Sequence, residues 1–175
     1  MKRRYINRER QISKVSYVRL FTGFAGLSLG VLLYLSDRPP ESTWFVQNYL
    51  HSSGEALHRI LPDLFGTLDR NIASFLHTFS FTMITGAFVG ESKTGCFMAA
   101  FIWCVVNVLF EVGQYFDTIV IRFIPDWFEQ YKFLKTVDDY FIAGSFDLGD
   151  IVAIFAGALV GFTVLVYQNR QDSID

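Results

Sequence analysis

Residues 96–116 read CFMAAFIWCVVNVLFEVGQYF and carry one charged side chain, that of Glu111. A helix needs about 20 mostly apolar residues to cross the hydrocarbon core of a bilayer, and this stretch has that length. It shows no alternation of polar and apolar residues, which favours a helix over a barrel strand. The stretch therefore predicts a membrane-spanning helix, and it leaves Glu111 and Gln114, near its end, to be explained.

The composition of the whole chain agrees with a membrane environment. Of its 175 residues, 51% are hydrophobic and 18% are charged, whereas a soluble domain averages about 25% charged residues. A soluble fold of this size would leave too much apolar surface in water, but lipid accepts apolar side chains on the outside of a protein. The length fits a single domain, 1–175.

Three further stretches, 20–36, 71–90 and 148–167, have the length and composition of membrane spans. The first follows a basic tail, as in a signal peptide, but no small-x-small cleavage site comes after it, so it predicts an uncleaved anchor. Tyr17 and Arg19 can extend from its edge to the membrane surface. The predicted fold is an all-α integral membrane protein, a bundle of four transmembrane helices.

The basic residues predict how these helices are oriented. The tail 1–15 holds six Lys and Arg residues against Glu9 alone, and an excess of Lys and Arg marks the cytoplasmic side. Four spans then place both termini and the short turn 91–95 on the cytoplasmic side of the cell membrane. The tail could instead bind nucleic acid, but one short basic stretch beside a span favours orientation and contact with anionic lipid.

The two longer connections, 37–70 and 117–147, are expected on the outer side. Pro125 and Asp126 are typical of a helix start, and the apolar residues from Trp127 to Leu134 recur at helical spacing. Aromatic rings favour the membrane interface, so we expect an interfacial helix here. The segment 43–61 is interrupted by Ser-Ser-Gly and is expected to form two shorter pieces of the same kind.

Small residues predict where the spans pack closely. Gly26 and Gly30 form one small-xxx-small pair, and Gly157 and Gly161 form another. Such pairs let two helix backbones approach each other. We interpret both pairs as packing positions within the bundle rather than as a homodimer interface.

Ionisable side chains inside a span are energetically costly and usually functional. Three of the spans place such side chains at a similar depth in the outer half of the bilayer, and the spacing of their polar residues puts them on single helix faces. We therefore expect one functional or ligand-binding polar cluster. Its members are His77, Asn107, Glu111, Gln114, Asp147 and Asp150.

Two of the spans bring carboxylates to this cluster, Glu111 from one and Asp147 and Asp150 from the other. Carboxylates that face one pocket repel each other, so a proton, a metal ion or a cationic ligand is implied. The alternative is a hydrogen-bonded knot that only fixes helix register. No phosphate-binding loop, nucleophile elbow or metalloprotease signature occurs in the sequence. No cofactor, metal site or catalytic residue is therefore assigned.

The order of these polar residues resembles that of a known family. His77 in one span, FEVGQ ending the next and FDLGDIVAIFAGALVG opening the last resemble the VanZ-like family, small bacterial membrane proteins that include the teicoplanin-resistance protein. The resemblance covers about 69–162 and implies a cell-envelope role, in some members resistance to glycopeptide antibiotics. Ile154 stands where the family often has Asn, and the family's Arg before the Asp pair is absent.

Three functions are compatible with these residues. The favoured one is an envelope factor that binds a lipid-linked or amphipathic ligand at the outer leaflet. The second is an intramembrane enzyme acting on a lipid headgroup, with Glu111 or Asp150 as general base and His77 as acid or metal ligand. The third is a scaffold for another membrane protein. The expected partners are membrane lipids, an envelope precursor carried on a lipid, or a second membrane protein, and not nucleic acid.

Overall fold

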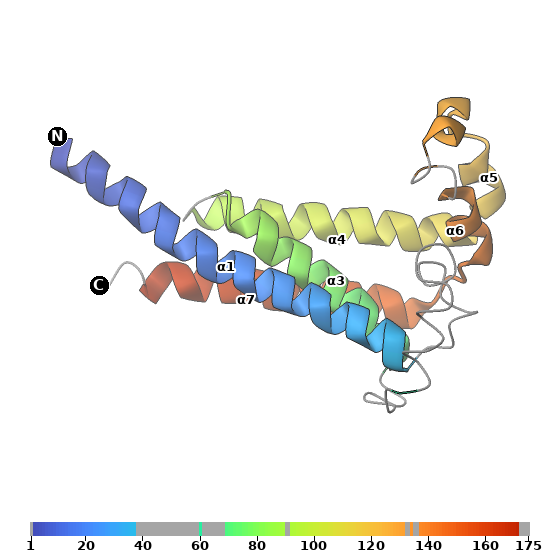
Figure 1. The fold of residues 1–175 in the computed structure, drawn as a ribbon, viewed down its shortest axis with the longest axis horizontal. Coiled ribbons are helices and arrows are strands. Elements are labelled where there is room, and N and C mark those ends of the chain that lie inside the picture. Colours follow the sequence, from blue (N-terminus) through green and yellow to red (C-terminus); the bar gives the residue numbers. More distant parts are fainter. Residues whose placement is uncertain are drawn as a thin grey trace.

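The computed structural model describes residues 2–37, 60, 69–89, 92–131, 134 and 137–171, and no β-strand occurs in these ranges. Four long helices lie side by side, and both chain termini lie at the same end (Figure 1). The all-α prediction is confirmed for the described residues. The four helices are α1 (Lys2–Ser36), α3 (Asp69–Gly86), α4 (Lys93–Tyr115) and α7 (Leu148–Gln171).

Three of these helices are long and apolar enough to cross a membrane. They are the segment Tyr17–Ser36 of α1, all of α4 and all of α7. The predicted span 71–90 is a helix, but α3 ends at Gly86 and is too rich in Asn, Ser, Thr and His to belong to that group. The predicted bounds of the other three agree with the structure to within a few residues, except that α1 continues back through the basic tail to Lys2.

The polar helix α3 occupies the middle of the bundle. It packs against α1, α7 and α4, and α7 also packs against α4. Thr78, Ser80 and Thr82 of α3 have no exposed surface. The more apolar helices therefore cover the hydroxyl groups of the least apolar one.

Glycines make this central packing possible. A Cβ atom added at Gly157 of α7 would lie 2.5 Å from the carbonyl oxygen of Phe75, and one at Gly161 would lie 2.8 Å from a methyl carbon of Thr82. On α1, Gly26 contacts Ser80 in the same close way. Gly30, its expected partner, has no described atom within 4 Å of an added Cβ, and Gly23 lies against α3 instead.

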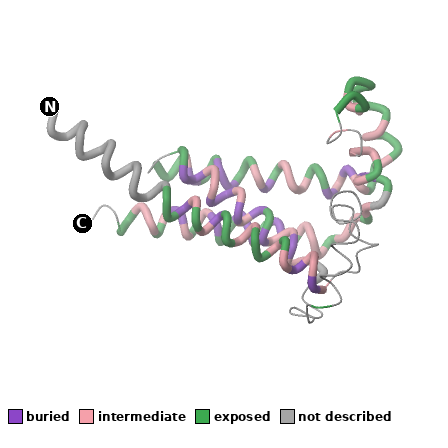
Figure 2. The backbone as a smooth tube through the Cα atoms, viewed as in Figure 1, coloured by how far each residue is buried: buried purple, intermediate pink, exposed green. Residues whose placement is uncertain are grey.

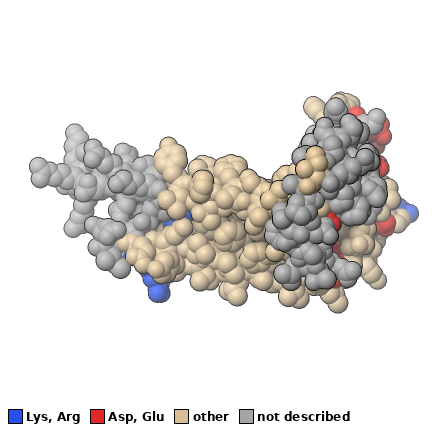
Figure 3. Space-filling model, turned by 60° about the horizontal axis from the view of Figure 1, so that its bottom comes forward, with Lys and Arg blue, Asp and Glu red and all other residues tan. Residues whose placement is uncertain are grey.

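The outside of the bundle is apolar along most of its length. Phe21, Phe24, Phe97, Phe101 and Phe155 are each more than half exposed. Buried residues lie on the sides where the helices face each other (Figure 2). On the face drawn in Figure 3, acidic side chains gather at the end that holds α5 and α6, and the middle carries almost no charge. This is the surface expected of helices surrounded by lipid.

Three short helices lie at the end of the bundle opposite the termini. They are α5 (Asp117–Ile121), η4 (Asp126–Gln130) and α6 (Val137–Ala143). The helix expected after Pro125 does begin at Asp126, but it is a 3-10 helix of five residues that ends at Gln130. The prediction that one helix continues from Trp127 to Leu134 is therefore wrong. The two pieces expected within 43–61 lie outside the described residues, apart from Ile60.

The connection predicted at 91–95 lies earlier in the chain, because α3 ends at Gly86 and α4 begins at Lys93. Helix α4 begins at Lys93, and the hydroxyl of Ser92 accepts a hydrogen bond of 2.9 Å from the backbone N–H of Gly95. A serine in this position satisfies one of the free N–H groups at a helix start. The first turn of α4 therefore includes residues that the sequence assigns to the turn.

Candidate ligand-binding site

The start of α7 is held by two carboxylates, those of Asp147 just before it and of Glu111 on α4. Asp147 immediately precedes α7, and its Oδ1 accepts a hydrogen bond of 2.8 Å from the backbone N–H of Gly149. The backbone N–H of Asp147 donates to Oε1 of Glu111 on α4, at 2.7 Å. In a capping box, the backbone N–H of the residue before the helix donates to a carboxylate three residues further along the same chain. Here Glu111 accepts this bond, so α4 is connected directly to the start of α7.

Asp150, which would fill that capping position, binds α3 instead. Its Oδ1 accepts hydrogen bonds from Oγ of Ser74, at 2.7 Å, and from Nδ2 of Asn71, at 3.2 Å. The same amide of Asn71 also lies 3.4 Å from Oδ2 of Asp147. One hydrogen-bonded network therefore joins α3, α4 and α7 at this end of the bundle, which we call the Glu111 end.

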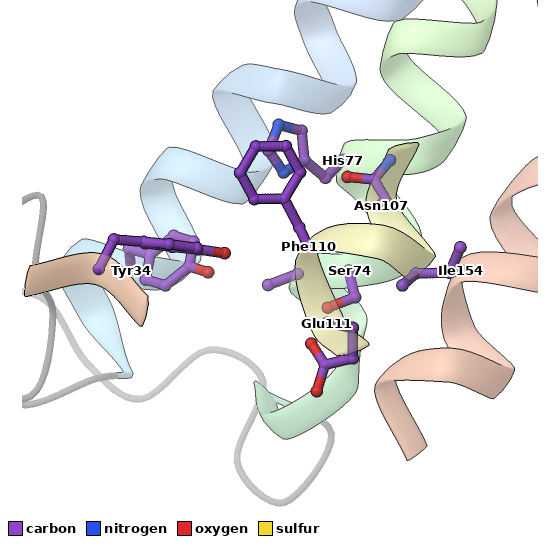
Figure 4. A pocket seen from close by; sticks show the side chains of 9 residues that line it. Tyr34, Ser74, His77, Asn107, Phe110, Glu111 and Ile154 are labelled. Atoms are coloured by element: carbon purple, nitrogen blue, oxygen red, sulfur yellow. The ribbon is translucent and has the colours of Figure 1, made fainter. Parts of the chain in front are cut away.

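A cavity of about 70 Å³ opens beside this network. A buried water needs roughly 10–15 Å³ by the same measure, so the cavity has room for a few waters or the tip of a polar headgroup. Helices α1, α3, α4, α6 and α7 all contribute to its wall (Figure 4). The lining residues are Tyr34, Ala73, Ser74, His77, Asn107, Phe110, Glu111, Tyr140 and Ile154.

Two phenols line the cavity from opposite parts of the chain, Tyr34 on α1 and Tyr140 on α6. Burial raises the pKa of Tyr140 above its ordinary value, and the neighbouring Tyr34 raises it further, while a hydrogen bond with Gln114 opposes the shift. The Tyr140 phenol is therefore neutral at physiological pH and can both donate and accept a hydrogen bond. The ring of Phe110 meets that of Tyr140 edge to face, with centroids 6.0 Å apart.

His77 lines the same cavity but belongs to an aromatic row along α3 and α4. Its ring lies 4.8 Å from that of Phe81, which stacks at 4.3 Å on Trp103. The indole N–H of Trp103 donates to Oγ1 of Thr85 at 2.6 Å. His77 is exposed, and within the described part of the chain no hydrogen bond connects it to a carboxylate.

The expected six-residue cluster thus divides into three parts. Glu111, His77 and Asn107 line the cavity. Asp147 and Asp150 do not line it and instead hold the start of α7 against α3 and α4. Gln114 lies behind Tyr140, against Gly144.

Sequence reasoning left four polar residues of this region out of the cluster. Asn71 and Ser74 lie three residues apart, and Ser74 lies three residues before His77, so their shared helix face was visible as a signal. Tyr34 and Tyr140 gave no such signal, because only the packing of α1 and α6 brings them to the cavity.

A metal site would need several suitable ligands close together. Among the described residues, no three His, Cys, Asp or Glu side chains gather in a way that could hold a metal ion. The carboxylates of Asp147 and Asp150 already accept hydrogen bonds from α3 and from the start of α7.

The opposite end of the bundle, which we call the Arg19 end, holds a second polar group. Arg19 is buried, donates from Nη1 to the carbonyl oxygen of Gly86 at 2.8 Å, and donates from Nη2 to Oδ1 of Asn169. Nδ2 of Asn169 lies 3.2 Å from Sγ of Cys96. The expectation that Arg19 extends to the membrane surface is wrong, because the end of α3 supplies a carbonyl acceptor inside the bundle.

No protein-family model, curated protein or solved structure matches the chain.

Proposed function

We propose that the chain is a four-span, VanZ-like membrane protein of the cell envelope that binds a lipid-linked or amphipathic ligand in the cavity at the Glu111 end. The observation that carries this proposal is the position of the cavity. Its polar lining lies at one end of a bundle whose sides are apolar. A ligand with a polar head and a hydrocarbon tail matches both environments.

The covered position of α3 supports a fourth span. Its 18 residues extend about 27 Å at 1.5 Å per residue, close to the roughly 30 Å of a bilayer core. Its hydroxyl groups are buried against α1 and α7, where polar groups are tolerated inside a membrane. With α3 spanning, both termini lie on one side, and the basic tail 1–15 favours the cytoplasm for that side.

The short helices support placing the Glu111 end at a membrane surface, and the basic tail at the opposite end favours the outer one. Phe123, just after α5, is 81% exposed, and Trp127 of η4 is 51% exposed. Exposed aromatic rings next to a span favour the headgroup layer. Topology reporters fused at Ser92 and at the C-terminus should both report the cytoplasm, whereas an outside signal at either position would contradict four spans.

A second candidate is an enzyme that acts on a lipid headgroup. One observation favours it: Glu111 and His77 line the same small cavity from different helices. A buried carboxylate and an imidazole are suited to transfer protons to and from a bound substrate. The binder is preferred because nothing in the described residues pairs a nucleophile with either group.

Lipid mass spectrometry separates these candidates. Cells lacking the chain are compared with cells carrying the wild type or Glu111→Gln. A binder predicts changed amounts or leaflet distribution of an unmodified lipid in the first and third strains. A missing covalent modification would favour the enzyme, and an unchanged lipid profile together with loss of a partner membrane protein would favour a scaffold.

A further inference from the structure

We propose that the cavity takes the primary ammonium group of a lipid headgroup, as in phosphatidylethanolamine. This inference rests on the proposed binding function and specifies its ligand. The sequence leaves a proton, a metal ion and a cationic ligand open, and the lining of the cavity favours the cationic ligand.

The charges around the cavity favour a cation. Glu111 is 7% exposed and lines the cavity, and Asp147 and Asp150 lie in the network joined to it. Among the described residues that line the cavity there is no Lys or Arg, and the buried Arg19 lies at the opposite end of the bundle. Because charges interact strongly where water is excluded, an anionic phosphate or carboxylate would be repelled here.

The hydrogen-bonding groups favour a primary ammonium over a quaternary one. An ammonium has three N–H donors, and Glu111, Tyr34 and Tyr140 supply acceptor oxygens from three different helices. Only Oε1 of Glu111 is used by the start of α7, and no described residue donates to the other carboxylate oxygen. A trimethylammonium has no N–H and could not donate a hydrogen bond to any of these oxygens.

The aromatic wall favours a cation of either kind over an anion. Phe110 and Tyr140 meet edge to face, and Tyr34 of α1 lines the cavity close to Tyr140. A cation over an aromatic face gains about 0.5–2 kcal/mol. The volume of about 70 Å³ holds an aminoethyl group, with the lipid phosphate at the mouth and the acyl chains along the apolar outer surface of the bundle.

The test is native mass spectrometry of the full chain. The protein is purified in micelles with equimolar phosphatidylethanolamine, phosphatidylcholine and phosphatidylglycerol. We expect the wild type to retain phosphatidylethanolamine about tenfold over the other two, a difference equal to about 1.4 kcal/mol. Glu111→Gln should lose this preference. Asp126→Asn, which changes an exposed carboxylate on η4, should keep it.

The alternative outcomes separate this inference from the proposed function. Retention of phosphatidylglycerol in a Glu111-dependent manner would overturn the ammonium but leave a lipid-binding cavity, and equal retention of phosphatidylcholine would overturn the need for N–H donors. No lipid retained by any variant would contradict the binding function itself. Soluble glycerophosphoethanolamine should not compete with the lipid. If it binds equally well, the ligand is a soluble primary amine rather than a lipid.

Glu111→Gln keeps an oxygen that can accept from Asp147, so it is expected to fold. Tyr140→Phe provides a second probe, because it keeps the ring and removes one acceptor oxygen. We expect it to remove most of the tenfold preference for phosphatidylethanolamine, because the lost hydrogen bond is donated by a charged group and such bonds contribute about 1.5–3 kcal/mol. An unchanged preference in both variants would overturn the assignment.

Discussion

The two ends of the bundle each bury polar side chains, but they use them differently. At the Arg19 end, the guanidinium fills the space between helices and donates to Gly86 and Asn169. At the Glu111 end, the polar groups form a network and also leave an open cavity beside it. Buried polarity alone therefore does not point to a binding site in this protein, whereas buried polarity next to unfilled space supports the one we propose.

The same comparison divides the acidic residues. Asp147 and Asp150 resemble Arg19 in that their partners are backbone groups and side chains of neighbouring helices. Glu111 has one oxygen engaged in this way and also lines the cavity. Substitutions at each position should therefore separate structural effects from binding effects.

The largest effect on stability is expected at the contact between α7 and α3, because α3 supplies hydrogen-bonding groups to both ends of the bundle. Gly157→Val would place side-chain atoms against the carbonyl oxygen of Phe75, which cannot move without shifting α3. Overpacking of this kind costs about 1–3 kcal/mol or more, so we expect poor accumulation and a strongly lowered melting temperature in detergent.

Gly30→Ala is the matched control for this substitution. It also adds bulk to a helix glycine, but no described atom lies within 4 Å of the added Cβ. Alanine is the better helix former, so a neutral or slightly raised melting temperature is expected. Equal destabilisation by both substitutions would mean that α3 and α7 do not pack as closely as described.

Arg19→Leu should have the next largest effect. It leaves the carbonyl oxygen of Gly86 and the amide of Asn169 without the donor that they have now. A buried polar group without a partner costs about 1–3 kcal/mol, so thermal unfolding should shift down by several degrees while headgroup binding at the far end is retained. Arg122→Leu, at an exposed arginine, should shift it little. Loss of binding in Arg19→Leu at unchanged stability would contradict a structural role for this end.

Ser74→Ala should have a smaller effect. It removes the 2.7 Å hydrogen bond to Asp150 but leaves Asn71 as a donor to the same oxygen. Hydrogen bonds to charged groups contribute about 1.5–3 kcal/mol, and the remaining donor should limit the loss to the lower part of that range. The exposed Ser145→Ala serves as control in the same thermal measurement. If both variants melt alike, Asp150 does not hold α7 against α3.

The sequence predicted the apolar helices well, because length and hydropathy decide where a chain can cross a membrane. It also brought Glu111, His77 and Asn107 to one region, since their depths in neighbouring spans are similar. It could not assign separate roles to Glu111 and Asp150. Both are carboxylates near a helix end, and only the direction of their hydrogen bonds distinguishes them.

Other features depend on packing that no local pattern reports. The burial of Arg19 follows from where α3 ends, which leaves the carbonyl oxygen of Gly86 facing α1. The presence of Tyr140 in the cavity follows from the packing of α6 against α5 and α4. The polar character of α3 was visible in the sequence, but its central position was not.

Glu111→Gln is expected to have the smallest effect on stability and the largest on binding. Glutamine keeps the oxygen that accepts from Asp147 and removes only the charge. The most direct measurement is the melting temperature of the wild type and this variant, each with and without added phosphatidylethanolamine. A ligand that binds only the folded state raises the melting temperature by mass action.

The account predicts that wild type and variant melt within about 2 °C of each other without lipid, which corresponds to less than about 1 kcal/mol for a chain of this length. Added phosphatidylethanolamine should then raise only the wild-type value. The opposite result, a variant that melts well below the wild type without lipid yet responds equally to the lipid, would contradict the account and make Glu111 a structural residue like Asp150.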